Sequence, residues 1–215
     1  MNKKILFVLL TSILSSFVAP VSAFEELGEV SLKPMEKPSP LPMGAGTEWH
    51  WLKSEFFNTD GKEHIIYYES VDSEKHRVRD SDGCSSTRLT GMFAPSLELY
   101  DCYQERGITQ KIIETTGHPW PLSEKTEFQF EYAGKYDDGF DGQWQITRFC
   151  KVNKQVRVRV PAGEFDTYQL VCEDKWDTRT YWISPQLGHR VAFKRRVKWF
   201  LSRSYMLELV KVVNP

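Results

Sequence analysis

The feature that most limits what this chain can fold into is a period of two in its polar and apolar residues. In Gln155-Val156-Arg157-Val158-Arg159-Val160, three valines alternate with three polar residues. A strand would place the two kinds on opposite faces. Similar short segments follow one another with turn residues between them, and no long segment with the apolar spacing of a helix lies outside the N-terminal 23 residues. The predicted strands are 48–56, 63–70, 98–103, 108–115, 127–132, 143–152, 155–160, 166–173, 178–183, 191–199 and 204–213.

Short turns join these segments, without helices between them. The turn signals are Asp60-Gly61, Asp82-Gly83, Pro161-Ala162-Gly163 and Leu187-Gly188. In the third of them proline fixes its own φ and Gly163 permits a positive φ, which predicts a tight reversal between two strands. Consecutive strands with short turns favour antiparallel pairing, so we predict an all-β fold, either a meander, a sandwich or an open barrel.

The N-terminus predicts export from the cytoplasm. Lys3 and Lys4 precede an apolar run over 5–19, and Val21-Ser22-Ala23 offers the small residues that a signal peptidase needs. The run is shorter than the roughly 20 residues of a membrane span. We therefore expect a signal peptide over 1–23, a proline-rich linker over 24–46 and a β domain over 47–215. The cleaved protein is expected to be soluble in the periplasm and not to span the membrane.

The charge of the chain excludes some partners. Removing Lys3 and Lys4 from the 28 basic residues leaves 26 against 29 acidic ones, a net charge of −3. This balance gives no reason to expect nucleic acid as a partner. The basic run Lys194-Arg195-Arg196 is typical of a solvated strand face or a protected edge, with anionic glycan or lipid headgroups as the alternative ligands.

Four cysteines remain after cleavage, which predicts two disulfides with three ways of pairing them. Cys150 and Cys172 lie on either side of the predicted Pro161-Ala162-Gly163 reversal, so strand pairing would bring them near each other. Their spacing from the turn is unequal, and pairing them needs a bulge or bend near Asn153. We predict the disulfides Cys84–Cys102 and Cys150–Cys172.

Two motifs resemble an uncharacterised group of bacterial periplasmic proteins. They are Val158-Arg159-Val160-Pro161-Ala162-Gly163-Glu164-Phe165-Asp166 and Tyr181-Trp182-Ile183-Ser184-Pro185-Gln186-Leu187-Gly188, matching V-x-V-P-A-G-x-F-D and Y-W-x-x-P-x-x-G. The resemblance implies a single strongly curved antiparallel sheet, a half-barrel similar to that of lipoprotein carriers. It implies no activity, because a fold alone does not carry one.

The sequence contains no recognisable catalytic or metal-binding motif. The five histidines have no close metal-ligand spacing, and neither a G-x-S-x-G nor a phosphate-binding loop is present. Asp137-Asp138-Gly139-Phe140-Asp141-Gly142 partly matches a calcium loop but lacks the closing Glu, since position 148 is Arg. We therefore expect no enzyme activity, no cofactor and no metal.

The leading functional hypothesis is a carrier or binding protein that holds a lipid or another amphiphile on the concave face of the sheet. Aromatic residues in predicted strands are the candidate ligand contacts, although aromatics also favour ordinary cores. They are Trp49, Trp51, Trp144, Tyr181 and Trp199. The alternative is an assembly protein that docks onto another envelope protein through a sheet edge or the linker. An envelope hydrolase has the least support.

Overall fold

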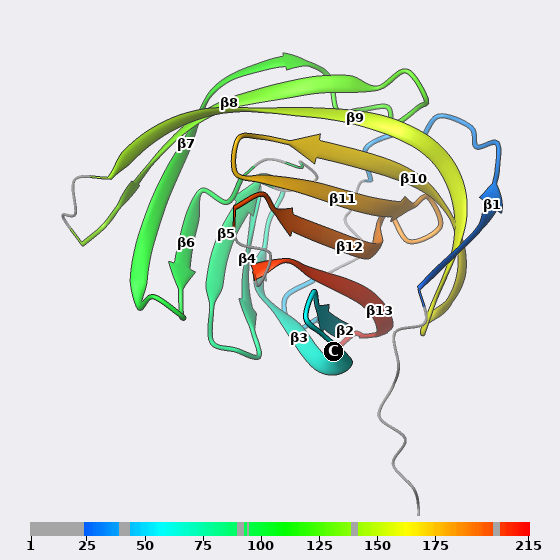
Figure 1. The fold of residues 1–215 in the computed structure, drawn as a ribbon, viewed down its shortest axis with the longest axis horizontal. Coiled ribbons are helices and arrows are strands. Elements are labelled where there is room, and N and C mark those ends of the chain that lie inside the picture. Colours follow the sequence, from blue (N-terminus) through cyan, green and yellow to red (C-terminus); the bar gives the residue numbers. More distant parts are fainter. Residues whose placement is uncertain (1–23, 39–43, 90–92, 94, 139–141, 200–202) are drawn as a thin grey trace, which may run out of the picture.

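The computed structural model describes residues 24–38, 44–89, 93, 95–138, 142–199 and 203–215. Within these ranges the chain forms thirteen strands (Figure 1). They are β1 (Glu25–Glu29), β2 (Glu48–Glu55), β3 (Asn58–Val71), β4 (Lys75–Asp80), β5 (Ser85–Leu89), β6 (Glu98–Asp101), β7 (Arg106–Gly117), β8 (Glu127–Tyr136), β9 (Gln143–Val160), β10 (Gly163–Glu173), β11 (Asp177–Ser184), β12 (His189–Val197) and β13 (Tyr205–Val213). The predicted all-β class with antiparallel pairing is confirmed. The predicted signal peptide lies outside the described residues.

Strands β2 to β13 form a closed barrel in which each strand pairs antiparallel with the next. The barrel is closed by the last strand, β13, which pairs with the first one, β2, from Tyr205↔Glu55 to Val213↔Glu48. The predicted half-barrel or open barrel is therefore wrong. A meander leaves the edges of its first and last strands unpaired, and here the curvature of the sheet brings these two edges together and removes both.

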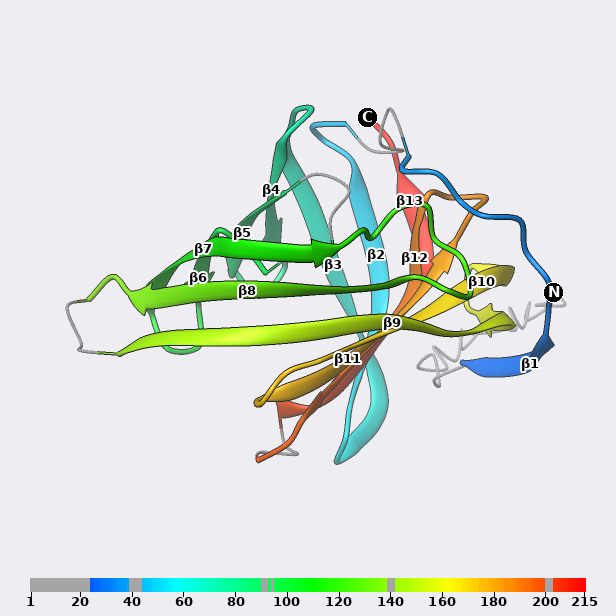
Figure 2. The same ribbon diagram turned by 90° about the horizontal axis from the view of Figure 1, so that it is seen from above.

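Strand β9 is the longest strand and bends strongly. It arches over the molecule and curls down beside β1 (Figure 1), and Figure 2 shows β8 and β9 running together across the top of the barrel. Its register against β10 shifts at Asn153, since Val152 pairs with Leu170 but Lys154 pairs with Gln169. This extra residue is the predicted bulge, and it brings Cys150 directly opposite Cys172. The structure contains both predicted disulfides, Cys84–Cys102 and Cys150–Cys172.

The segment predicted as a linker contributes to the fold. Strand β8 covers β9 only as far as Lys151, and β1 occupies the free edge beyond it, pairing with residues Val156 to Arg159. After β1 the chain runs along β10, where the Tyr168 hydroxyl donates to the carbonyl of Lys33. Met35 then exchanges two backbone hydrogen bonds with Leu122 and joins the core. Residues 24–38 are thus packed on the barrel and are not a free arm.

Two apolar layers stabilise the barrel wall. Because directly opposite residues share a face, Leu170 points inward with Tyr181, whereas Val156 and Val158 point to the other side. The valines are nevertheless buried, since the β9–β10 hairpin bends over the outside of the barrel. At its tip the Ala162 N–H donates to a carbonyl on β13. The perfect alternation seen in the sequence therefore packs an outer layer and not the barrel interior.

One predicted turn is misplaced. The chain reverses at Phe56-Phe57, and β3 continues straight through the predicted turn Asp60-Gly61. A Cβ on Gly61 would lie 2.3 Å from Cδ1 of Leu52 on the neighbouring strand. Glycine is needed here because the two strands approach closely and not because the chain turns.

The Pro161-Ala162-Gly163 turn forms as predicted, with Gly163 at a φ of 130°. We expect Gly163→Val to lower the free energy of unfolding by about 1–3 kcal/mol, because a β-branched residue is strained at positive φ. Urea denaturation measures this loss. Ala162→Val, in the same turn, is the control and should cost clearly less; equal losses would show that φ at position 163 is not the reason.

Candidate functional site

The barrel encloses a cavity of about 350 Å³. Strands β3 to β9 and β11 to β13 all contribute lining side chains. Its volume is at the lower end of the range for pockets that hold small organic molecules. The cavity is the candidate ligand site, since the ring of strands fixes the position of every side chain in its wall.

One part of the cavity wall is apolar and aromatic. Trp144 packs edge-on against Trp176 with ring centroids 5.8 Å apart, and against Tyr136 at 5.1 Å. Tyr181 contacts Phe193 at 5.0 Å. Aliphatic side chains complete this part of the wall, among them Ile66, Val78, Leu99, Ile108 and Leu207.

The other part of the wall is strongly cationic. Five arginines and two aspartates line the cavity. The arginines are Arg88 on β5, Arg148 on β9, Arg179 on β11, and Arg190 and Arg195 on β12. The aspartates are Asp80 on β4 and Asp177 on β11.

Three of these arginines are held by buried carboxylates. Arg148 donates to Asp174 over 2.6 Å from Nη2 and 3.0 Å from Nε, and both side chains are at most 2% exposed. Asp177 accepts from Arg179 at 2.9 Å and from Arg195 at 2.7 Å. Burial alone would raise the pKa of Asp177, but the two guanidinium groups outweigh it and lower that pKa to about 2. These contacts form a rigid ionic layer.

Arg88 and Arg190 have no carboxylate partner among the described residues. The Nε of Arg88 donates to the Ser86 hydroxyl at 3.1 Å. The guanidinium of Arg190 lies 5.4 Å from the ring centre of Trp51 and 5.0 Å from that of Phe193. Burial, followed by the charge of Arg190, lowers the pKa of Arg88. Two positive charges therefore face the cavity without compensation.

Two half-buried histidines lie close to these arginines and remain neutral. Burial, followed by the charge of Arg190, lowers the pKa of His189 to about 3, and burial, followed by the charge of Arg88, lowers that of His76 to about 4. His189 Nε2 lies 3.4 Å from the Tyr68 hydroxyl. At neutral pH both rings are uncharged.

Four of the five predicted aromatic contact residues face the barrel interior. Trp144 and Tyr181 line the cavity. Trp49 and Trp51 stack on each other with ring centroids 5.8 Å apart and are 2% and 0% exposed, so they act as core residues behind Arg190 and His189. Trp199 lies beyond the end of β12 and is 77% exposed. Its predicted place in a strand is wrong, because β12 ends at Val197.

The cationic residues were missed as site residues in the sequence. The predicted basic run over 194–196 contains Arg195, whose side chain points inward to Asp177. The sequence did contain a signal, because residues two apart on a strand share a face. Arg195 lies two residues after Phe193 and Arg179 two residues before Tyr181, so each arginine shares a face with an aromatic residue.

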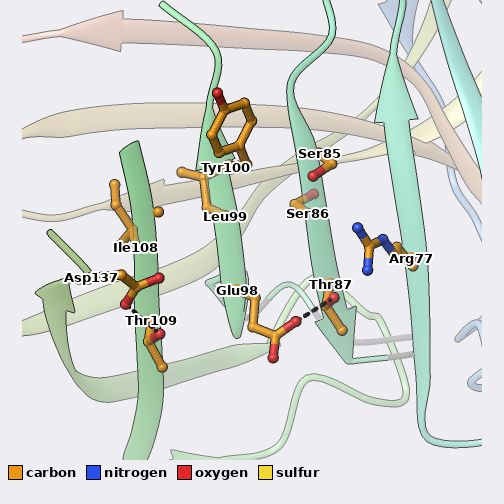
Figure 3. Close-up of a pocket in the computed structure, with 11 residues that line it drawn as sticks. Arg77, Ser85, Ser86, Thr87, Glu98, Leu99, Tyr100, Ile108, Thr109 and Asp137 are labelled. Atoms are coloured by element: carbon orange, nitrogen blue, oxygen red, sulfur yellow. Dashed lines mark hydrogen bonds between the residues drawn. The ribbon is translucent and has the colours of Figure 1, made fainter. Parts of the chain in front are cut away.

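Two further features are weaker candidates. A hollow of about 280 Å³ on the outer side of β4 to β7 is lined mainly by short polar side chains (Figure 3). Its carboxylates are already bonded, Glu98 to Thr87 at 3.0 Å and Asp137 to Thr109 at 2.8 Å. Residues 139–141 of the possible calcium loop lie outside the described residues.

His64, Asp80 and Asp82 could approach a metal ion together. Asp82, however, already accepts hydrogen bonds from the Tyr103 hydroxyl at 2.6 Å and the Lys53 ammonium at 3.3 Å. The ammonium group supplies the positive charge that a metal ion would bring. Within the described ranges no helix is long and apolar enough to cross a bilayer.

Comparison with known proteins identifies no family. No protein-family model and no curated protein matches the chain. Among solved structures it is similar to the hypothetical lipoprotein YmcC from Escherichia coli, with a TM-score of 0.45 and 9% identity over 80% of this chain and 88% of that one. It is also similar to a protein from Parabacteroides distasonis described as a lipoprotein. The TM-score is 0.43 and the identity 10%, over 85% of this chain and 100% of that one. A third similar structure is a protein from Bacteroides fragilis described as exported, with a YmcC-like fold. Its TM-score is 0.41 and its identity 8%, over 85% of this chain and 100% of that one.

The ionic layer predicts a large stability effect. Arg148→Met should lower the free energy of unfolding by about 3–5 kcal/mol, because it leaves the Asp174 carboxylate buried without its cation. The control is Arg157→Met, which removes a solvent-exposed pair with Asp166 and should cost far less. Urea denaturation at neutral pH compares the two, and similar losses would contradict a structural role for the buried pair.

The neutral histidines predict a dependence of stability on pH. His189 and His76 bind protons near pH 6.5 when unfolded but only near pH 3 and pH 4 when folded. Their contribution is therefore fully present above pH 6.5 and is lost as the pH falls from there towards 4. Each histidine should add about 1.4 kcal/mol per pH unit to the slope of unfolding free energy in this window. Denaturation of His189→Asn from pH 6.5 to 4.5 should show a slope smaller by about that amount; an unchanged slope would contradict burial of a neutral His189.

Proposed function

We propose that the protein is a non-catalytic binding or carrier protein of the periplasm, which holds an amphipathic ligand inside its barrel. The observation that carries this proposal is the 350 Å³ cavity, whose wall is aromatic in one part and cationic in another. An amphiphile has the same division into an apolar and a polar part, so both parts would find complementary surroundings. The ligand is small, because the cavity is too small for a complete two-chain lipid.

A periplasmic location agrees with the covalent structure. The structure contains two disulfides, and all four cysteines of the sequence take part in them. Disulfides persist in compartments outside the cytoplasm. The cleavage after Ala23 that export requires remains a prediction.

The electrostatics of the cavity favour binding over catalysis. A general acid or base works best when its pKa lies near the working pH. Asp177 has a pKa of about 2 and is fixed by two arginines, and Asp174 is fixed by Arg148. These carboxylates hold the wall together and are poorly suited to exchanging protons with a substrate.

Filling the cavity tests the proposal. Ile66 on β3 lines the cavity and lies outside the ionic layer, so Ile66→Trp should occupy ligand space. We expect protein purified gently from the periplasm to carry an amphiphile, detected by native mass spectrometry and solvent extraction, and Ile66→Trp to lose it. The matched control is Ile113→Trp, because Ile113 is 47% exposed.

The wild type should in addition bind octyl phosphate or octyl glucoside in titration calorimetry. Ile66→Phe is the milder replacement if Ile66→Trp does not fold, as judged by near-UV circular dichroism. A ligand-free wild type that binds neither compound would refute the proposal, as would equal binding by the two tryptophan variants.

A further inference from the structure

The uncompensated pair Arg88 and Arg190 marks a specific place in the cavity. Burying a charge is costly unless an opposite charge or several hydrogen bonds accompany it. In the ionic layer each guanidinium has a carboxylate, whereas Arg88 and Arg190, on strands β5 and β12, have none among the described residues. The charge of Arg190 also lowers the pKa of Arg88, which shows that the two like charges interact. Within the described part of the chain their charge is unbalanced, so a bound anion would find two cations available.

The groups around the pair suit an anion. Ser86 and Ser96 line the same cavity, and Tyr68, His76 and His189 interact electrostatically with the pair but are uncharged near neutral pH. Two carboxylates line the cavity: Asp177 is bonded to Arg179 and Arg195, and Asp80 accepts backbone hydrogen bonds from Asp82 and Cys84. Both carboxylates are therefore engaged elsewhere and neither is paired with Arg88 or Arg190.

The geometry of Arg190 leaves hydrogen-bond donors free. Its guanidinium lies against the faces of Trp51 and Phe193, which fixes its plane. Its Nε is buried and has no hydrogen-bond partner among the residues that the structure describes. An N–H group that is buried and unbonded is unfavourable, which adds to the cost of holding Arg190 in this position.

We propose that Arg88 and Arg190 together bind a phosphate group, the polar end of a phosphate monoester amphiphile whose apolar part packs against Tyr181, Phe193 and Leu207. Two guanidinium groups match the two negative charges of a phosphate monoester, and their planar donor edges fit its oxygens. The three apolar residues line the cavity beside the arginines. This inference rests on the proposed function and names its ligand class.

Titration calorimetry with three probes tests the inference: octyl phosphate, the uncharged octyl glucoside, and inorganic phosphate. The wild type should bind octyl phosphate at least about 10-fold more tightly than octyl glucoside. Arg88→Gln and Arg190→Gln should each weaken octyl phosphate binding by roughly 10- to 100-fold, as expected for a charged hydrogen bond. Neither should change binding of octyl glucoside. The control is Arg77→Gln, whose side chain on the outside of β4 is 56% exposed and pairs with Glu69.

A second readout separates binding from a structural role. Removing an uncompensated, half-buried charge should leave the melting temperature of the empty protein unchanged or raise it. A fall in melting temperature, together with unchanged octyl phosphate affinity, would show that the arginines serve the fold and would overturn the proposal. The two single variants are independent, so one that fails to fold leaves the other to decide.

The probes also distinguish failure of the phosphate site from failure of the proposed amphiphile-binding function. If octyl phosphate and octyl glucoside bind equally well, and both variants bind them as the wild type does, the phosphate site is refuted and the proposed function stands. If only inorganic phosphate binds, and does so through Arg88 and Arg190, the phosphate site is supported as a site for the free ion and the amphiphile is refuted. If no probe binds, both proposals fail.

Discussion

The pairing of β13 with β2 is the interaction on which the rest of the structure depends. It converts a curved meander into a closed ring, whose wall surrounds an interior that is partly screened from water. Inside such a ring, charges interact strongly, because little water is left to screen them. The ionic layer, the lowered pKa values of the histidines and the uncompensated arginines all follow from this closure. On an open sheet the same side chains would be ordinary surface residues.

Much of the local structure could be predicted from the sequence, because strands and turns depend on neighbouring residues. The reversal at Gly163, the bulge at Asn153 and both disulfides follow from residue types and spacing along one hairpin or loop. Closure could not be predicted in this way. It depends on two strands about 150 residues apart, and nothing in either strand indicates its partner. The turn predicted at Asp60-Gly61 was wrong for a similar reason, because a contact with another strand decided the role of the glycine. Glycine occurs both in turns and where two strands approach closely, and the sequence alone does not distinguish the two.

The sequence singled out the aromatic residues of the candidate site but not its arginines. Trp49, Trp51, Trp144 and Tyr181 were found because aromatic residues in strands stand out, and all four do face the interior. Arg88 and Arg190 were missed because an arginine in a strand is normally exposed. Only the knowledge that the sheet closes shows that these inward-facing arginines line a cavity and not the outer surface.

The order of the strands along the chain also governs how the protein must assemble. The strand that closes the ring is the last one to be synthesised, and β1, at the other end of the chain, pairs with a strand about 130 residues away. Until β13 emerges, β2 keeps an exposed edge that other chains could pair with. Contacts so distant in sequence form slowly. The Cys84–Cys102 disulfide, by contrast, links residues only 18 apart and can form as soon as that loop is made. A chain of this design therefore exposes an open strand edge to aggregation until β13 is available to cover it.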